Sequence, residues 1–142
     1  MQKILVAVDG SKSAKKAVEF AIDLVQGGKK DAKLYLLTVQ PPITFGNIKK
    51  FVKKKALEGY YEDQGKDALK EARDLAEKEK IDFSAHIKVG PVAEAIVDFA
   101  KDKDCALIVV GTRGLGKLAG MLVGSVAMRV VHLSAVPVAL VK

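Results

Sequence analysis

The sequence lacks the features of disulfide-rich, membrane-spanning and secreted proteins. It has one cysteine, Cys105, in 142 residues, which excludes an internal disulfide framework and is typical of a reducing cytoplasm. No apolar run approaches the length of a membrane span. The N-terminal residues MQKILVAVDG lead directly into a short apolar segment and lack the pattern of a secretory signal peptide. We therefore expect a cytoplasmic protein with no membrane partner.

Aromatic residues are also scarce, at 6% with no tryptophan, and this bears on the meaning of the positive charge. The formal net charge is +7, and the rest of the chain carries only +2 once five clustered lysines are set aside: Lys49, Lys50, Lys53, Lys54 and Lys55. A nucleic acid or a membrane surface would suit such a segment, but no aromatic stacking platform or DNA-reading motif accompanies it. We favour a solvated helix face and expect no nucleic-acid partner.

The rest of the sequence alternates apolar strand segments with amphipathic helical segments. The expected strands cover residues 3–9, 34–39, 81–89, 105–110 and 136–141. Between them lie a helix capped by Ser11 or Ser13, a long helix over 62–80, a helix entered at Pro91 and a helix over 125–133. This alternation predicts a single α/β domain over residues 1–142, with a parallel sheet and helices on both faces.

Two of the expected strands differ from the others and fix the strand order. The strand over 81–89 alternates apolar and polar residues, which indicates a sheet edge with His86 as a surface residue. The strand over 136–141 carries Pro137 near its start, which also indicates an edge. The order 3-2-1-4-5 satisfies both and places a crevice between Asp9 and Gly111, at the ends of strands one and four. Because the last strand is hydrophobic on its edge, we expect a second subunit to cover it and form a homodimer.

A glycine-rich loop follows the fourth strand and ends at a helix that begins with a hydroxyl residue, Ser125. The loop contains five glycines: Gly111, Gly114, Gly116, Gly120 and Gly124. Glycines let the backbone turn its N–H groups toward an anion, and a helix N-terminus adds free donors and partial positive charge. Arg113 and Lys117 supply further charge for phosphate oxygens. These features favour a phosphate cradle over the alternative, a connection that merely turns the chain.

Two better-known phosphate motifs do not fit this loop. The stretch from Gly111 to Lys117 matches the start of a P-loop, but Leu118 stands where Ser or Thr would bind Mg²⁺. A dinucleotide-like glycine pattern begins at Gly114, but it lies near the C-terminus, and Val136 stands where an acidic residue is needed. The sequence therefore excludes a P-loop NTPase and a dinucleotide-binding motif.

The spacing that remains is Gly111, two residues, Gly114, nine residues, and then Gly124 and Ser125. It resembles the signature of the ATP-binding members of the universal stress protein family. Further similarity to this family covers nearly the whole chain, in the segments ILVAVDGS, GPVAEAIVDFA, DCALIVVGTRG, GSVAMRVV and VPVALV. The resemblance implies a five-stranded domain of the adenine nucleotide alpha hydrolase-like (Rossmann-like) fold, a homodimer through the last strand, and bound ATP, with Mg²⁺.

The resemblance also implies roles for particular residues. Asp9 and its neighbours Ala7 and Val8 would flank the adenine and ribose, and Asp9 is the candidate ligand for Mg²⁺. Val39 would pack on the adenine, and Gly111 would approach the ribose. The phosphates would be held by the loop and the helix start: Thr112, Arg113, Gly114, Leu115, Gly116, Lys117, Gly124, Ser125 and Val126. Some members of the family have proline where Ala7 stands.

No set of residues in the sequence indicates catalysis. There is no Ser/His/Asp arrangement, no pair of carboxylates near the loop, and no base placed to orient an attacking water. The sequence therefore predicts a nucleotide-dependent regulator of stress or signalling that acts as a homodimer on an unidentified protein partner. A slow ATPase and a dimeric scaffold that binds no nucleotide are the alternatives.

Overall fold

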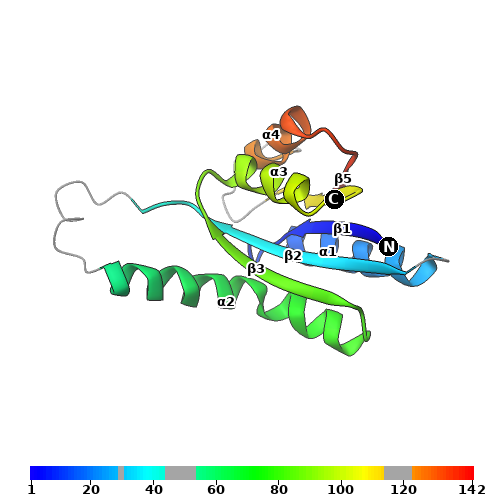
Figure 1. Ribbon diagram of the computed structural model, residues 1–142, viewed down its shortest axis with the longest axis horizontal. Coiled ribbons are helices and arrows are strands. Elements are labelled where there is room, and N and C mark those ends of the chain that lie inside the picture. The colour runs from blue at the N-terminus through cyan, green and yellow to red at the C-terminus, as the bar shows by residue number, and fades with distance from the viewer. Residues whose placement is uncertain (29–30, 44–53, 114–122) are drawn as a thin grey trace.

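A computed structural model describes residues 1–28, 31–43, 54–113 and 123–142 (Figure 1). Within these ranges strands and helices alternate, as the sequence predicts. The strands are β1 (Gln2–Ala7), β2 (Ala32–Gln40), β3 (Phe83–Val89), β4 (Leu107–Gly111) and β5 (Val138–Val141). The helices are α1 (Lys12–Gly27), α2 (Lys54–Lys78), α3 (Val92–Asp102) and α4 (Ser125–Leu133). The predicted α/β class is confirmed.

The strands form one parallel sheet in the order β3-β2-β1-β4-β5, which is the predicted order. β1 lies at the centre, with Val6 opposite Leu36 of β2 and Val109 of β4. Neighbouring side chains of a strand point to opposite faces, and both faces of this sheet are covered. The consecutive residues Ile4, Leu5 and Val6 of β1 are therefore all buried.

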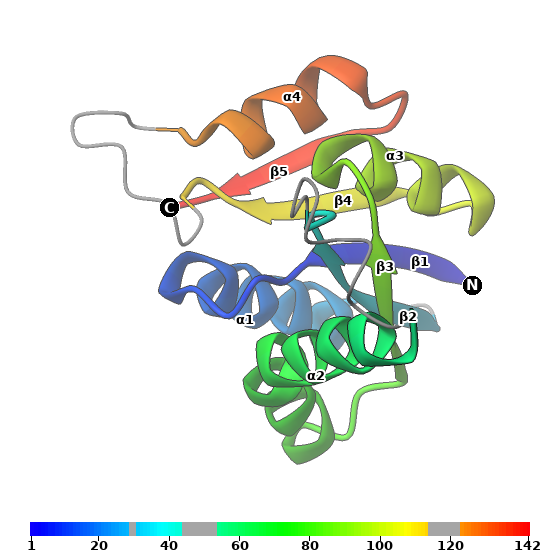
Figure 2. The same ribbon diagram turned by 90° about the vertical axis from the view of Figure 1, so that its left-hand side faces the viewer.

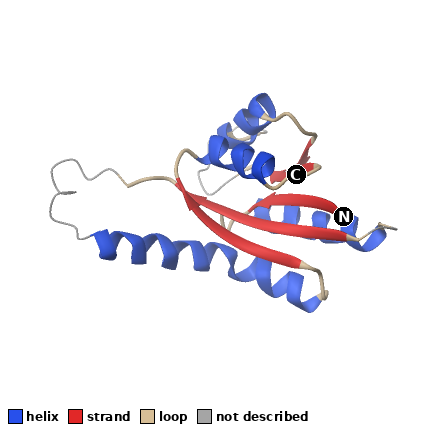
Figure 3. Ribbon diagram, viewed as in Figure 1, coloured by secondary structure: helices blue, strands red, loops and turns tan. Residues whose placement is uncertain are grey.

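The helices form two layers, one on each face of the sheet (Figure 2). α1 and α2 lie on one face, where Ile4 and Val6 of β1 belong to their core. α3 and α4 lie on the other face, where Leu5 of β1 belongs to a second core. Figure 3 shows the strands with α2 on one side and with α3 and α4 on the other. Because each face of the sheet has its own core, the faces of the central strands are covered, and the ends of these strands are left for a ligand.

α1 begins where the sequence indicates. Ser11 is its N-cap, and the Ser11 Oγ accepts a hydrogen bond from the N–H of Ala14 at 3.1 Å. The buried stripe of the helix is the predicted one: Ala14, Ala17, Val18, Ala21 and Ile22. This stripe packs α1 beneath β1 and β4, so its first turn lies at the ends of both strands.

α2 is longer than the sequence suggested, and this prediction was wrong. The expected helix began at residue 62, whereas α2 begins at Lys54. Gly59 lies inside the helix without ending it, because one glycine costs a helix only about 1 kcal/mol. The N-terminal part of α2 is also anchored, since the Tyr61 hydroxyl accepts a hydrogen bond from the N–H of Ile43 at 2.7 Å.

α2 approaches the sheet most closely at Gly65. A Cβ at this position would lie 2.6 Å from Cδ1 and 2.7 Å from Cγ1 of Ile87 in β3. Those distances are too short for carbon atoms in contact, so the close approach of α2 to β3 requires a glycine here unless Ile87 moves.

The polar face of β3 is less exposed than its alternating sequence suggested. His86 is half-buried, and its ring centroid lies 5.0 Å from that of Phe99 in α3 and 5.8 Å from that of Tyr35 in β2. The prediction of a simple surface residue was therefore wrong. Strand alternation identifies the face of a side chain, but it does not show how far the helix above that face extends.

β5 begins at Val138, two residues later than expected. Pro137 precedes it and has no N–H, yet its carbonyl accepts a hydrogen bond from the N–H of Ile108 in β4 at 3.0 Å. The proline thus continues the ladder toward β4. The predicted position of this strand at an edge is confirmed.

Candidate functional site

The ends of β1 and β4 lie side by side at one edge of the sheet. Val6 of β1 is aligned with Val109 of β4, so Asp9, just after β1, and Gly111, the last residue of β4, lie at the ends of neighbouring strands. The winding of the chain reverses between these two strands, and open α/β sheets bind their ligands at such a point. The structure therefore brings Asp9 and Gly111 together where the sequence predicted a crevice.

Gly111 packs against the first turn of α1. A Cβ at this position would lie 2.7 Å from the carbonyl carbon and 2.8 Å from the carbonyl oxygen of Ser13, and it would also collide with the Ser13 Oγ. No side chain fits here without a shift of backbone. Gly111 therefore has a packing role, whether or not it also approaches a ribose.

The first turn of α1 also holds the start of the glycine-rich loop. The N–H of Arg113 donates to the Ser13 Oγ at 3.2 Å, and the Ser11 Oγ donates to the Arg113 carbonyl at 3.5 Å. The Arg113 side chain is exposed. The β1–α1 turn thus sets the direction in which the loop leaves β4, while the guanidinium remains on the surface.

Thr112, at the start of the loop, hydrogen-bonds both to β5 and to the end of the loop. This residue is buried; its N–H donates to the carbonyl of Val141 at 2.9 Å, and its carbonyl accepts a hydrogen bond from the N–H of Gly124. The first and last glycines of the predicted motif therefore lie at the base of one loop that is closed by backbone hydrogen bonds.

α4 begins at this closed base, with Gly124 as its N-cap. Glycine has no side chain to accept from the first N–H groups of the helix, and within the described residues this N-cap makes no side-chain cap bond. The N–H groups of Ser125 and Val126 therefore provide hydrogen-bond donors at the positive end of the helix dipole. Ser125 is exposed, so its hydroxyl can join them.

The residues predicted around the adenine lie on two faces of the sheet. Ala7 and Val39 are half-buried and pack on the same apolar core under α3 and α4. Val8 is buried in the opposite core, under α1 and α2, and its N–H donates to the Leu37 carbonyl at 2.8 Å. Ala7 and Val39 can therefore form one wall for a base, whereas the Val8 side chain cannot.

Asp9 organises the turn between β1 and α1. Its Oδ1 accepts a hydrogen bond from the N–H of Ser11 at 2.9 Å, an arrangement that stabilises a turn. In the described ranges, no three His, Cys, Asp or Glu side chains are grouped so as to hold a metal ion. A Mg²⁺ at Asp9 would therefore need most of its ligands from phosphates and water.

Other predicted residues fall outside the described part of the chain. They are Gly114, Leu115, Gly116 and Lys117 of the loop, and Lys49, Lys50 and Lys53 of the lysine-rich segment. Cys105 is described and is buried before β4, as expected of a core residue, and burial raises the pKa of its thiol. Among the described helices none is both long and apolar enough to cross a membrane.

Sequence reasoning missed the contact of Ser13 with the loop. Ser13 was considered only as an alternative N-cap to Ser11, and the structure assigns that role to Ser11. The sequence did contain a sign of this contact: of two hydroxyl residues at a helix start, one can cap the helix and the other can accept a hydrogen bond from another segment. The partner of that second hydroxyl, the N–H of Arg113, is remote in sequence and could not be foreseen.

The sheet order, with a glycine-rich loop after the fourth strand, defines the adenine nucleotide alpha hydrolase-like class of α/β fold. A profile of the universal stress protein family matches residues 1–142, and the chain belongs to this family. Universal stress protein MJ0531 of Methanocaldococcus jannaschii is 31% identical over 141 residues, which are 99% of this chain and 82% of that protein. Universal stress protein YxiE of Bacillus subtilis is 31% identical over 147 residues, 99% of this chain and 98% of that protein.

Solved structures agree with this assignment. Hypothetical protein MJ0577 has a TM-score of 0.85 at 26% identity, with 99% of this chain and 95% of that chain covered. A universal stress protein in complex with cAMP has a TM-score of 0.74 at 29% identity, with 99% and 97% covered. The universal stress protein from Archaeoglobus fulgidus in complex with dAMP has a TM-score of 0.73 at 26% identity, with 100% and 98% covered. Two of these similar proteins thus bind an adenine nucleotide.

Proposed function

We propose that this protein binds ATP, with Mg²⁺, at the ends of β1 and β4 and acts in the cytoplasm as a nucleotide-dependent regulator of stress or signalling. The complexes of similar proteins with cAMP and dAMP support the adenine nucleotide as the ligand class. The choice of ATP depends on the loop between Gly111 and Gly124, which is long enough to follow several phosphates.

One observation carries the proposal. The hydrogen bond between Thr112 and Gly124 closes the loop at its base, directly beside the start of α4, whose N-cap is Gly124. In general, glycine-rich loops and helix N-termini offer backbone N–H groups that suit the oxygens of a phosphate chain. The Asp9 turn lies next to this base through the contact of Gly111 with Ser13.

Different described residues would contact the base, the ribose and the phosphates of such a nucleotide. Ala7 and Val39 would pack against the base, and the second oxygen of Asp9 would accept from a ribose hydroxyl or bind Mg²⁺. Ser125 and the first N–H groups of α4 would donate to phosphate oxygens, and Arg113 would partly neutralise their charge. The negative charge of a bound triphosphate would complement these hydrogen-bond donors and the positive charge of Arg113.

We also propose that the protein is a homodimer through β5. This strand is an edge of the sheet, and Leu140 in it is 40% exposed. On the neighbouring helix α4, Met128 is 54% exposed and Val131 is 44% exposed. A hydrophobic edge beside exposed apolar side chains favours a second copy as its cover.

Calorimetric titration of nucleotide-stripped protein with Mg-ATP, AMP and GTP tests the proposed ligand. We expect saturable binding of ATP, weaker binding of AMP and little binding of GTP. Ser125→Ala should weaken ATP binding by about tenfold or more, since a hydrogen bond to a charged group contributes about 1.5–3 kcal/mol. Ser134→Ala, at the other end of α4, is the matched control and should leave ATP binding unchanged.

Two outcomes would change the conclusion. A folded protein that binds no adenine nucleotide would leave the dimeric scaffold as the function. Phosphate release that is lost in Asp9→Ala while ATP binding persists would instead make the protein a slow ATPase.

A further inference from the structure

The edge of the sheet formed by β3 carries backbone groups that point away from the protein. Among the described strands β3 pairs with β2 alone, and two bonds define its orientation: the N–H of Leu34 donates to the Asp82 carbonyl at 2.9 Å, and the N–H of Gly90 donates to the Gln40 carbonyl at 3.1 Å. Alternate residues of a strand direct both of their backbone groups to the same side. The even-numbered residues of β3 therefore face β2, and the odd-numbered ones, including Ala85 and Ile87, face outward.

A groove lies on the α2 side of this edge. Its volume is about 340 Å³, and its apolar surface comes from Leu69 of α2 and from Ala85 and Ile87 of β3. The wall formed by α2 carries both signs of charge, with Lys70 and Arg73 near Asp74. The groove therefore has no strong preference for charge and suits apolar side chains.

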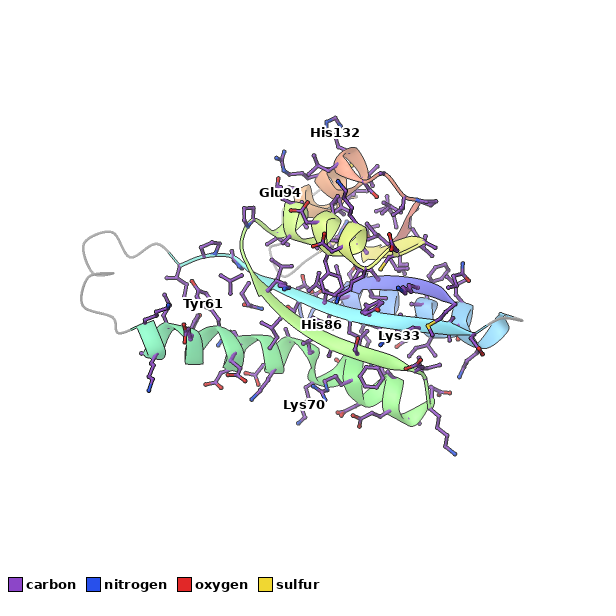
Figure 4. All side chains as sticks on the ribbon, in the orientation of Figure 1. Lys33, Tyr61, Lys70, His86, Glu94 and His132 are labelled. Carbon is purple, nitrogen blue, oxygen red and sulfur yellow. The ribbon has the colours of Figure 1, made fainter. Side chains whose placement is uncertain are left out.

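The other side of the same edge is positively charged. Lys88 is exposed at the end of β3, Lys33 Nζ lies 5.2 Å from the ring centroid of Tyr35, and Lys103 Nζ lies 5.9 Å from that of Phe99. His86 lies among them; burial, followed by the charges of Lys103, Lys88 and Lys33, lowers its pKa. In Figure 4, Lys33 and His86 lie along β2 and β3, whereas Lys70 projects from α2.

We propose that the β3 edge binds an extended acidic peptide of a partner protein as an added strand. Such a peptide would hydrogen-bond to the outward backbone groups of Ala85 and Ile87. Successive side chains of a strand point to opposite faces. Acidic side chains at alternate positions would therefore meet Lys33, Lys88 and Lys103, and small apolar side chains between them would enter the groove.

This occupant fits the edge better than two others. A second copy of β3 would bring its own Lys88 against this edge, and lysine on an edge strand opposes such pairing. A nucleic acid would use the lysines but could not continue the backbone ladder or fill the groove. The two surfaces adjoin, because Lys88 pairs in register with Val39 of β2, but the proposal does not rest on nucleotide binding.

The probe for this proposal is a fluorescein-labelled peptide of alternating glutamate and valine, of the seven-residue length of β3, followed by fluorescence anisotropy. We expect the acidic peptide to bind, its lysine–valine counterpart not to bind, and the affinity to fall with added salt. Lys33→Glu with Lys88→Glu should weaken binding about tenfold or more. The matched control, Lys12→Glu with Lys16→Glu on the exposed face of α1, changes the net charge equally and should weaken it much less.

Ala85→Pro tests the strand ladder itself. It removes an outward N–H while leaving the bonds to β2 in place, which edge strands tolerate. We expect peptide binding to be lost while the thermal unfolding of the protein remains cooperative; if Ala85→Pro does not fold, Val89→Pro removes the last outward N–H of β3.

Three results would overturn the proposal: no peptide binding at millimolar concentration, binding that a folded proline variant retains, or equal weakening by the two pairs of lysine changes. Binding of a single-stranded oligonucleotide in place of the peptide, lost in the Lys33 and Lys88 variant, would assign this surface to nucleic acid and would equally overturn it.

Discussion

The contact between Gly111 and the first turn of α1 makes a prediction whose size follows from the structure. In Gly111→Ala the new Cβ would lie 2.7 Å from the carbonyl carbon of Ser13 and 2.8 Å from its oxygen. These are backbone atoms at the start of a helix, so α1 or the end of β4 must shift. Overpacking of this kind costs about 1–3 kcal/mol, and the fixed neighbours place Gly111→Ala near about 2 kcal/mol.

The expected change in melting temperature can be estimated as well. An unfolding entropy of about 2.1 cal/mol/K per residue gives about 0.3 kcal/mol/K for a chain of this length. A loss of about 2 kcal/mol therefore lowers the melting temperature by about 7 °C. Urea unfolding and calorimetric melting of the nucleotide-free protein measure the two quantities independently of any ligand.

Two further variants distinguish the backbone contact from general effects of replacing glycine. Gly59→Ala in α2 is the matched control: apart from the adjacent backbone of its own helix, no atom of the described residues lies within 4 Å of the new Cβ, so it should stabilise the helix by roughly 0.5–1 kcal/mol. Ser13→Ala removes the hydroxyl contact but not the backbone one, so Gly111→Ala should remain destabilising beside it. Parent-like stability of Gly111→Ala, or full recovery in the double variant, would refute the reasoning.

The remaining predictions concern the two edges of the sheet and the layer beneath β3. Gly65→Ala should cost about 1 kcal/mol in urea unfolding, but it should become neutral or stabilising beside Ile87→Ala, which removes the side chain in its way; a cost that persists in the double variant would contradict this. Burial, followed by neighbouring lysine charges, lowers the pKa of His86 below 6.5, so protonation favours the unfolded state. The contribution of His86 to stability is therefore complete above pH 6.5 and is lost as the pH falls through the lower pKa of the folded state. Between about pH 7.5 and about pH 5, His86→Phe should lose less stability than the parent protein. An equal loss in both would show that His86 is not the cause of the pH dependence. Leu140→Lys should shift the protein toward a monomer in sedimentation velocity, whereas Leu24→Lys, at a side chain of equal 40% exposure on α1, should not; a monomeric parent would exclude the dimer.

The fold was predictable because its strands and helices have clear patterns. β1 is apolar on both faces and so must be central, and Pro137 beside a hydrophobic strand indicated the second edge. The start of α2 was not predictable, because the contact between Tyr61 and Ile43 that anchors it joins positions distant in sequence.

The candidate site was predictable only in part, for the same reason. The predicted strand order correctly placed Asp9 beside Gly111, whereas phosphate binding by the glycine-rich loop stays a prediction. The contact of Ser13 with the loop and the bonds of Thr112 to Val141 and Gly124 connect different elements. Such contacts depend on how the elements pack, and no local pattern encodes them.

The central claim is that an adenine nucleotide binds at the ends of β1 and β4, and NMR shift mapping with ¹⁵N-labelled protein tests it most directly. Addition of Mg-ATP should shift the amide signals of Asp9, Gly111, Thr112, Ser125 and Val126 most strongly, while AMP should shift Asp9 and Gly111 more than the start of α4. Amides of β3 such as Ala85 serve as the internal control and should not move. Shifts confined to other surfaces, or no shifts at saturating nucleotide, would contradict the account.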